Sequence, residues 1–295
     1  MKMFKSGKWC YALFMVVSVL ASSALHAEQT VAKNERVAAL LPDSFKQSGT
    51  LRIAIPDIGK PLAYKEGGEL KGMDVELAKA LAAVMGLKAE VRLVPFAAAL
   101  AGLQANKYDI SYGEFYVTAE RLKVADFVTN WQDYSSFLVA KAKNFAPKTL
   151  KEICGSKVGA MAGSAELATL KTAVDKCDGK APTISAFASI NQAILALNSN
   201  RVNGVLINRG GAQEAIRMDK GLAASGEIGG GPTATAVARN ADSPKTLAAI
   251  KAGYDSLINS GDYMKILNNN DTAYGAAKSA EIYTANSTPP SYAFN

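Results

Sequence analysis

Hydrophobic residues along this chain fall into short runs and longer segments of helical periodicity, which alternate from residue 49 onward. Residues 51–55 form a short β-rich run that Pro56 ends. In residues 74–85 the apolar positions recur at helical spacing, with Asp74 where an N-cap is expected and Gly86 where the helix ends. The same signals predict strands at 89–94, 108–111, 157–161, 183–187 and 202–207, and helices at 97–105, 164–174 and 190–197. Strands that alternate with helices of this length indicate an α/β fold with parallel sheets covered by helices.

Two extended runs, residues 136–140 and 233–238, divide this pattern into two sets. About 90 residues lie between the runs, which is enough for one small α/β domain. A domain inserted through two strands predicts two α/β lobes joined by two hinge strands. The predicted limits are 49–138 plus 236–270 for lobe one, 142–231 for lobe two, and 271–295 for a loosely packed C-terminal tail.

The first 27 residues have the order of a secretory signal peptide: a basic start, an apolar run, and small residues before a cleavage site. The apolar run at 10–20 is shorter than the roughly 20 residues of a membrane-spanning helix. Cleavage after Ala27 fits best, and cleavage after Ala24 is the alternative. The sequence therefore predicts a signal peptide at 1–27 and localisation in the periplasm.

Composition excludes several kinds of chemistry once this segment is set aside. Removing 27 of the 295 residues leaves 268, and the formal charge falls from +7 to +4 because the segment holds three lysines and no acid. The one histidine lies in it too, so the remaining chain cannot form Ser-His-Asp or Cys-His catalytic groups, or histidine-based metal sites. A charge of +4 does not argue for nucleic acid as a partner. Residues 229–232 (GGGP) are predicted to be a turn near the hinge rather than a phosphate loop, because no helical pattern follows them.

Six segments between residues 49 and 265 carry motifs in an order typical of one family. Residues 70–78 (LKGMDVELA) are similar to a G-F-D-V-D-L-A segment, and residues 118–127 (TAERLKVADF) are similar to T-x-E-R…D-F. Further matches lie at 49–53, 103–109, 157–166 and 196–202. In these segments the chain resembles the periplasmic solute-binding proteins of polar amino-acid ABC importers, which are extracellular solute-binding proteins of family 3 with the type II periplasmic binding fold.

The resemblance implies two α/β lobes that close on one small-molecule ligand in the cleft between them. It also implies docking of the closed form on an inner-membrane permease, and it gives the signal peptide a purpose. We expect a monomer without a cofactor or a metal site. Membership of such a family does not by itself establish transport, because the same fold hosts other tasks.

Arg121 is the leading candidate for ligand binding. In the family, the arginine of T-x-E-R binds the α-carboxylate of the ligand, which a guanidinium fork matches with two hydrogen bonds. Thr118, which opens this motif, joins it as a candidate. Gly163 and Ser164 are the lobe-two counterpart, because backbone N–H groups and a hydroxyl at a helix N-terminus suit an anion. The alternatives are a surface arginine at a helix start and an ordinary N-cap serine.

Phe96 stands where many family members stack an aromatic ring on the ligand, although an aromatic before an apolar helix is also typical of core. Glu114 and Tyr116 occupy positions where small hydroxyl residues are usual, and we expect Glu114 to line the cleft. Asn208 replaces the aspartate that accepts the ligand's α-ammonium in the family, so it can accept a hydrogen bond but cannot neutralise a charge. Either Glu114 supplies the missing anion, or the ligand is not a standard α-amino acid.

Cys154 and Cys177 enclose 22 residues within lobe two. An exported chain meets an oxidising compartment, so a structural disulfide is expected, and one branch of the family has cysteines here. A redox-active dithiol would require a close C-x-x-C pair, which the sequence lacks.

Three functions remain open from the sequence. The leading hypothesis is a non-enzymatic periplasmic binding protein that captures a small polar, carboxylate-bearing ligand, such as an amino acid or a derivative, for an ABC importer. The second is a periplasmic enzyme on the same fold, similar to cyclohexadienyl dehydratase, with Glu114 as acid or base. The third is an accessory protein that contacts a periplasmic partner complex.

Overall fold

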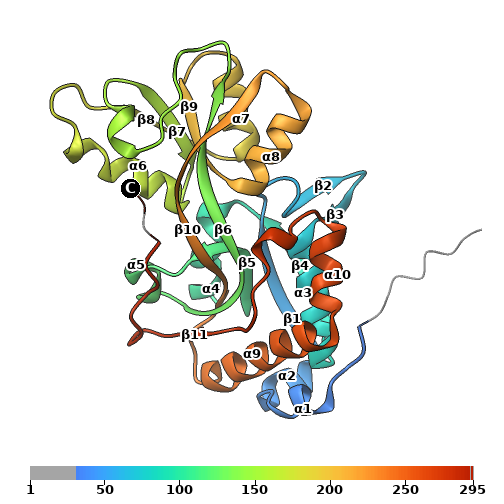
Figure 1. Ribbon diagram of the computed structural model, residues 1–295. Coiled ribbons are helices and arrows are strands. Elements are labelled where there is room, and N and C mark those ends of the chain that lie inside the picture. The colour runs from blue at the N-terminus through green and yellow to red at the C-terminus, as the bar shows by residue number, and fades with distance from the viewer. Residues whose placement is uncertain (1–30, 293, 295) are drawn as a thin grey trace, which may run out of the picture.

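The computed structural model describes residues 31–292 and 294, which form two α/β lobes joined by long strands (Figure 1). The predicted signal peptide lies outside the described residues. One mixed sheet runs through both lobes, and a short eleventh strand pairs with β6. The order across the sheet is β4 (Lys88–Val94), β1 (Thr50–Pro56), β5 (Ile110–Tyr116), β10 (Leu222–Val237), β6 (Asp126–Ala140), β9 (Gly204–Asn208), β7 (Lys157–Met161) and β8 (Thr183–Phe187). The predicted α/β class with two lobes and two connecting strands is confirmed.

Strands β6 and β10 run antiparallel to each other and connect the lobes. In lobe one, β10 pairs with β5 through residues 233–237, and in lobe two β6 pairs with β9 through residues 135–139. The predicted turn at 229–232 is wrong, because these residues continue β10 opposite residues 132–135 of β6. Both extended runs are therefore longer than the sequence pattern suggested, and the lobe limits given above remain predictions.

Lobe one packs its helices around β4, β1 and β5, and the hydrophobic core that they form continues into lobe two through residues such as Met161 and Ile190. Its short elements are the hairpin of β2 (Tyr64–Glu66) and β3 (Glu69–Lys71) and the helices α1 (Glu35–Ala39), α2 (Asp43–Ser48) and α5 (Ala119–Leu122). The covering helices are α3 (Met73–Met85), α4 (Ala99–Gln104) after a 3-10 turn at Phe96–Ala98, α9 (Ser243–Ser260) and α10 (Asp262–Asn269).

Helix α3 begins differently from the sequence prediction, because Asp74 is not its N-cap. Gly72 occupies that position with φ +110°, and the N–H groups of Met73 and Asp74 donate to the carbonyls of Pro61 and Leu62. These carbonyls satisfy donors that a capping side chain would otherwise serve. The Asp74 side chain is thereby released from the helix end and turns into the protein, where it is fully buried.

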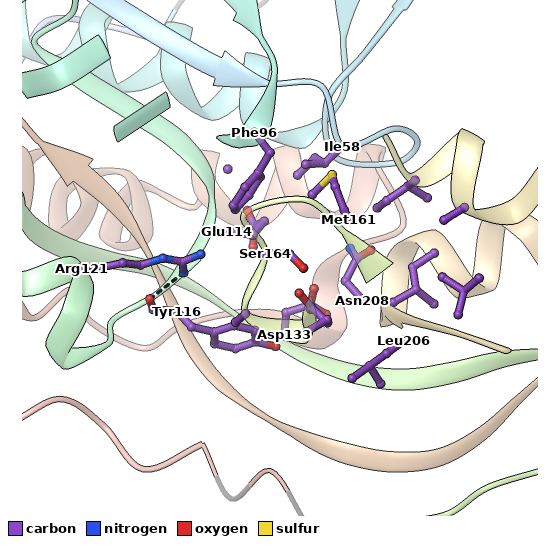
Figure 2. Close-up of a pocket in the computed structure, with 17 residues that line it drawn as sticks. Ile58, Phe96, Glu114, Tyr116, Arg121, Asp133, Met161, Ser164, Leu206 and Asn208 are labelled. Carbon is purple, nitrogen blue, oxygen red and sulfur yellow. Dashed lines mark hydrogen bonds between the residues drawn. The ribbon is translucent and has the colours of Figure 1, made fainter. Parts of the chain in front are cut away.

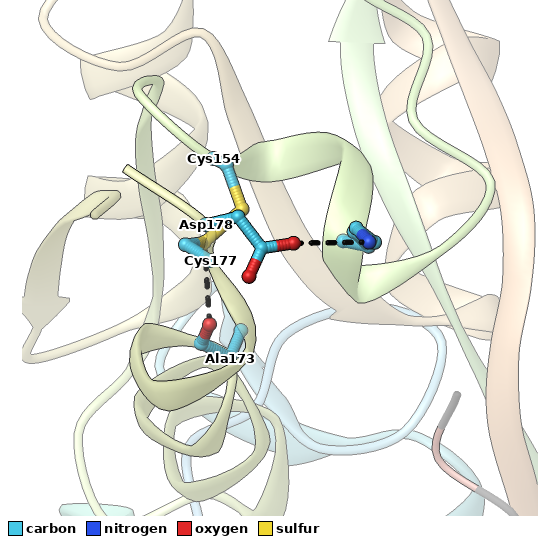
Figure 3. Close-up of a disulfide and its surroundings, with 5 residues drawn as sticks. Cys154, Ala173, Cys177 and Asp178 are labelled. Atoms are coloured by element: carbon cyan, nitrogen blue, oxygen red, sulfur yellow. Dashed lines mark hydrogen bonds and ion pairs between the residues drawn. A yellow bond between two sulfur atoms is a disulfide. The ribbon is translucent and has the colours of Figure 1, made fainter. Parts of the chain in front are cut away.

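Lobe two covers β7, β8 and β9 with α6 (Ala165–Thr172), α7 (Ile190–Asn198) and α8 (Arg209–Met218). Helix α6 is shorter than predicted and is followed by a 3-10 turn at Val174–Lys176. The predicted disulfide is present: Cys154 and Cys177 are bonded with their Cα atoms 5.7 Å apart (Figure 3). It ties the 3-10 turn after α6 to the segment before β7.

The C-terminal tail is firmly packed, so the prediction of loose packing is wrong. Strand β9 pairs with β6 only in lobe two, so the lobe-one part of β6 has an open edge. Strand β11 (Ile282–Tyr283) pairs with Phe127 and Val128 at that edge. An unpaired strand edge is a site for added strands, which explains why the tail settles there. The tail then continues toward lobe two and ends near α6 (Figure 1), where Phe294 packs against the lobe-two core.

Within residues 31–292 and 294, the helices are all too short or too polar to cross a membrane.

Candidate functional site

A cavity of about 40 Å³ lies between the lobes, beside the crossing strands (Figure 2). Both lobes line it, and β6 contributes from the hinge. Its principal side chains are Ile58, Phe96, Glu114, Tyr116 and Arg121 from lobe one, Asp133 from β6, and Met161, Ser164, Glu166 and Asn208 from lobe two.

Arg121 lies at one end of this cavity, on the short helix α5. Thr118 does not line the cavity; its hydroxyl caps α5 by accepting from the Arg121 N–H at 3.2 Å. The Arg121 guanidinium donates to the Tyr116 carbonyl at 2.9 Å, and across the cleft to the Gly163 carbonyl at 3.1 Å. Its Cζ lies 5.7 Å and 5.3 Å from the ring centres of Phe96 and Phe115.

This guanidinium is a partly buried cation that makes no ion pair with an acid among the described residues, although Glu166 is close enough to favour its charged form. Partial burial lowers the pKa of Arg121, and the field of Glu166 opposes that shift. A partly buried cation with spare N–H donors is well suited to receive an anionic group.

The turn before α6 faces Arg121 from lobe two. Ser164 is the N-cap of α6, and its Oγ accepts from the Leu167 N–H at 3.1 Å while the side chain lines the cavity. The hydroxyl hydrogen is left to donate, so capping and ligand binding are compatible. Gly163 has φ +79°, and a Cβ there would lie 2.9 Å from the Cα of Ala97 in lobe one. The two lobes therefore touch at this glycine, and its carbonyl rather than its N–H faces Arg121.

Aromatic rings form one wall of the cavity. Phe96 is buried and its ring centre lies 5.1 Å from that of Phe115, so the ring serves the core as well as the cavity. Tyr116 lines the cavity and packs edge-on against Tyr292 of the tail, with 4.6 Å between ring centres. The tail thus supports a residue that the sequence placed in the site.

Glu114 lines the cavity as predicted, and its backbone is strained. The residue has φ +55°, which is uncommon outside glycine, and its side chain is 8% exposed. Oε2 accepts from the Thr233 hydroxyl at 2.9 Å, and the buried carboxyl also hydrogen-bonds that of Asp74. Burial raises the pKa of Glu114 well above its usual value, and the neighbouring Asp74 raises it further.

Asp74 lies behind Glu114 and was not foreseen as part of the site. Burial raises the pKa of Asp74 to about 7, and hydrogen bonding with Glu114 partly opposes the shift. The two carboxyls therefore titrate together, and burial favours a proton held between them. Asp74 lies in the motif segment 70–78, but helix-capping rules assigned its side chain to the start of the helix that follows.

Asp133 is the second acid that sequence reasoning missed. It lies on β6 where the strand crosses between lobes, is 1% exposed, and lines the cavity. Its Oδ1 accepts from the Tyr134 N–H at 2.8 Å. Burial raises the pKa of Asp133 well above its usual value, Glu114 adds to this, and a hydrogen bond with Asn208 partly offsets it.

Asn208 and Glu166 complete this end of the cavity from lobe two. Asn208 ends β9 opposite Ser135, two residues along β6 from Asp133, and its buried Oδ1 has no hydrogen-bond partner among residues 31–292 and 294. Glu166 Oε1 accepts from the Ser135 hydroxyl at 2.8 Å. Glu166 is the last residue of the motif segment 157–166, and the sequence did not assign it to the site. The acids do not form a metal site: in the described part of the chain, no group of three or more metal-binding side chains converges.

The cavity brings unlike groups together. Arg121, Ser164, Asn208 and the carboxyls of Glu114 and Asp133 all line it (Figure 2). Ile58 and Met161 add apolar surface to the lining. Such a cavity suits a small molecule that carries both an anionic and a cationic group.

Structural relatives share this two-lobed fold. An ancestral arginine-binding protein bound to glutamine is 28% identical, with a TM-score of 0.69 and coverage of 76% of this chain and 98% of that chain. An amino-acid ABC transporter substrate-binding protein, AbpA from Streptococcus pneumoniae, bound to L-arginine, is 24% identical, with a TM-score of 0.69 and coverage of 79% and 98%. The ancestral amino acid-binding protein AncCDT-1, a precursor of cyclohexadienyl dehydratase, is 24% identical, with a TM-score of 0.69 and coverage of 79% and 99%.

The sequence also matches a protein family over most of its length. Residues 51–270 fit the pattern of that family, and this range holds every residue that lines the cavity and all of the motif segments except residues 49 and 50. The segment after residue 270, which forms the packed tail, lies outside it. The chain belongs to the bacterial extracellular solute-binding proteins, family 3.

Proposed function

We propose that this protein is a periplasmic binding protein that captures a small carboxylate-bearing ligand, an amino acid or a derivative, and delivers it to an ABC importer. The observation that carries the proposal is Arg121, a partly buried guanidinium that lines the interlobe cavity without an ion pair in the described residues. A ligand carboxylate would accept from Arg121 and from the Ser164 hydroxyl. Relatives bound to glutamine and arginine support the ligand class.

Capture is coupled to movement of the lobes in this proposal. Arg121 of lobe one donates to Gly163 of lobe two, so the two lobes are linked through the same group that would hold the ligand. Both lobes line the cavity, so a ligand held there contacts both of them. Because a ligand touches both lobes only when they are together, it shifts the equilibrium toward a closed form. That form would dock, as a monomer, on an inner-membrane permease.

A thermal-shift screen tests this function. The protein is unfolded and refolded to remove bound metabolites, then heated with single L-amino acids and their derivatives. A ligand at 100 times its Kd stabilises the folded state by about 2.7 kcal/mol, which raises the Tm of a protein this size by roughly 5–10 °C. A panel of amino acids, 2-oxo acids and amines that leaves the Tm unchanged would refute the proposal.

An enzymatic role is the second candidate, and one observation favours it. Glu114 is a cavity carboxyl with a raised pKa, which is the state required of a general acid near neutral pH. Prephenate and arogenate are the substrates to test, with release of the aromatic product followed by absorbance. Turnover that Glu114→Gln abolishes would favour the enzyme, and absence of turnover with retained ligand binding would favour the binding protein.

A further inference from the structure

Three consecutive glycines, residues 229–231, lie in β10 where this strand crosses between the lobes beside β6. Gly229 and Gly231 have φ values of +141° and +151°, which glycine adopts far more readily than any other residue. A Cβ on Gly229 would lie 2.6 Å from the ring of Phe294, and a Cβ on Gly231 would lie 3.2 Å from the ring of Tyr292. The glycines therefore leave room for the C-terminal tail to lie against the hinge.

The tail lies along an edge of β10 that β5 does not cover. Among the described residues, β5 pairs with β10 only through residues 233–237. Beyond that point the Gly230 N–H donates to the backbone carbonyl of Tyr292 at 3.0 Å. The Tyr292 hydroxyl accepts from the Val117 N–H of lobe one and donates to the Pro232 carbonyl of β10. An open strand edge is a template for added backbone, and here the tail uses it to brace the hinge.

The tail also contacts lobe two at two separate places. Near its end, Phe294 packs against the lobe-two core. Near its start, the Tyr274 ring lies 5.2 Å from the ring of Trp131 on β6, and the guanidinium carbon of Arg209 in lobe two lies 4.3 Å from the centre of the Tyr274 ring. Between these places, β11 fixes the tail to lobe one. One segment therefore contacts both lobes and both hinge strands (Figure 1).

Tyr116 connects the tail to the cavity. It lines the cavity, and its ring packs edge-on against Tyr292 and Phe294, with 4.6 Å and 5.6 Å between ring centres. The Tyr116 carbonyl accepts from the Arg121 guanidinium, and the next residue, Val117, donates its N–H to Tyr292. The tail therefore supports both a wall of the cavity and the backbone that orients Arg121.

Parting of the lobes would break some of these contacts. Rotation at the hinge moves lobe two relative to lobe one, and the tail cannot follow both. It is held on lobe one by β11 and the Tyr292 hydroxyl, and it lies on lobe two through Phe294 and the Arg209 contact. Contacts that exist only while the lobes are together stabilise that arrangement. The tail lies outside residues 51–270, so it is not part of the pattern that the family shares.

We propose that the C-terminal tail is a clasp on the hinge, which holds the two lobes together and slows the release of a bound ligand. The slower release rests on the proposed function, because it regulates the same cavity, whereas the hold on the lobes does not depend on a ligand. Loss of the Phe294 ring should let the lobes part more easily. Aromatic contacts of this kind shift an equilibrium by up to about tenfold.

Small-angle X-ray scattering of the full refolded protein without ligand tests the hold on the lobes. Phe294→Ala removes the ring that lies on lobe two. The control, Ile282→Ala, shortens an apolar side chain of the same tail where β11 lies on lobe one. We expect a larger radius of gyration for Phe294→Ala than for wild type, and the wild-type value for Ile282→Ala. Equal radii for all three proteins, with cooperative urea unfolding showing that each is folded, overturn the clasp.

Stopped-flow fluorescence tests the effect on release. The probes are L-glutamine and L-arginine, and the reporter is Trp131, which lies on a hinge strand against the tail. We expect Phe294→Ala to release a probe about tenfold faster than wild type, and Ile282→Ala to release it at the wild-type rate. An unchanged release rate in Phe294→Ala overturns the slowing of release. If neither probe binds wild type, the proposed function loses its support, and the scattering comparison decides the clasp by itself.

Discussion

Tyr292 joins the C-terminal tail to the strands beside the cavity, and its hydroxyl can be removed without changing the ring. The Val117 N–H donates to the Tyr292 Oη at 2.6 Å, and the Tyr292 O–H donates to the Pro232 carbonyl at 2.9 Å. The backbone carbonyl of Tyr292 also accepts from the Gly230 N–H at 3.0 Å. Tyr292→Phe keeps this backbone bond and the ring contact with Tyr116, and it deletes both bonds of the hydroxyl.

The expected cost follows from burial of the partner left behind. Val117 is fully buried, so its N–H loses its partner without access to water. An unsatisfied buried donor costs about 1–3 kcal/mol, and the Pro232 carbonyl loses a bond as well. Because phenylalanine occupies nearly the volume of tyrosine, no cavity term is added. We expect Tyr292→Phe to lower the free energy of unfolding by about 2 kcal/mol.

Urea unfolding followed by circular dichroism measures this difference as a lower midpoint at an unchanged m value. The matched control is Tyr283→Phe in the same tail, where the hydroxyl bonds the exposed Glu281 and the change should cost less than about 0.5 kcal/mol. A Tyr292→Phe variant as stable as the control would refute the view that this hydroxyl secures the tail to the hinge region.

Three further changes test other parts of the structure. Replacing Cys154 and Cys177 by alanine opens a loop of sequence separation 23 and should lower the free energy of unfolding by about 3 kcal/mol, as measured by urea titration of the variant and of reduced wild type. Gly163→Ala puts a Cβ 2.9 Å from a lobe-one Cα and should weaken ligand binding at least about tenfold in calorimetry, whereas Gly261→Ala, at a similar φ of +82° with free space, should not. The pKa of Asp74 is raised to about 7, so the folded state holds this proton more tightly than the unfolded state does. The free energy of unfolding should therefore fall as the pH rises from about 4 to 7. Asp74→Asn should flatten that part of a curve of stability against pH.

The sequence identified one end of the site more completely than the other. Arg121, Ser164 and Phe96 lie in or beside motifs whose order the family shares, and the structure brings all three to one cavity. Glu114 was noticed because it departs from the usual small hydroxyl residue. Asp133 was missed because the strand pattern was recognised only from residue 136, and its neighbour Asn208 comes from a strand some 70 residues away. A pattern within one segment cannot show which residues of two distant strands lie side by side.

Two errors in the fold have the same origin. Asp74 has the residue type and position of an N-cap, but the carbonyls of Pro61 and Leu62 already satisfy the first turn of α3. The tail after residue 270 has no sustained alternation, and its order depends on the open edge that β6 offers in lobe one. Periodicity and capping rules describe contacts within a segment, whereas both outcomes depend on a segment distant in the sequence.

The affinity of Arg121→Ala for the ligand found in the thermal-shift screen tests the central claim most directly. Calorimetric titration should compare it with wild type and with Arg201→Ala, an exposed arginine of lobe two. Loss of hydrogen bonds to a charged partner costs about 1.5–3 kcal/mol, so Arg121→Ala should bind roughly 10-fold to 150-fold more weakly, while Arg201→Ala binds as wild type does. An Arg121→Ala protein that binds the ligand as tightly as wild type would contradict the account.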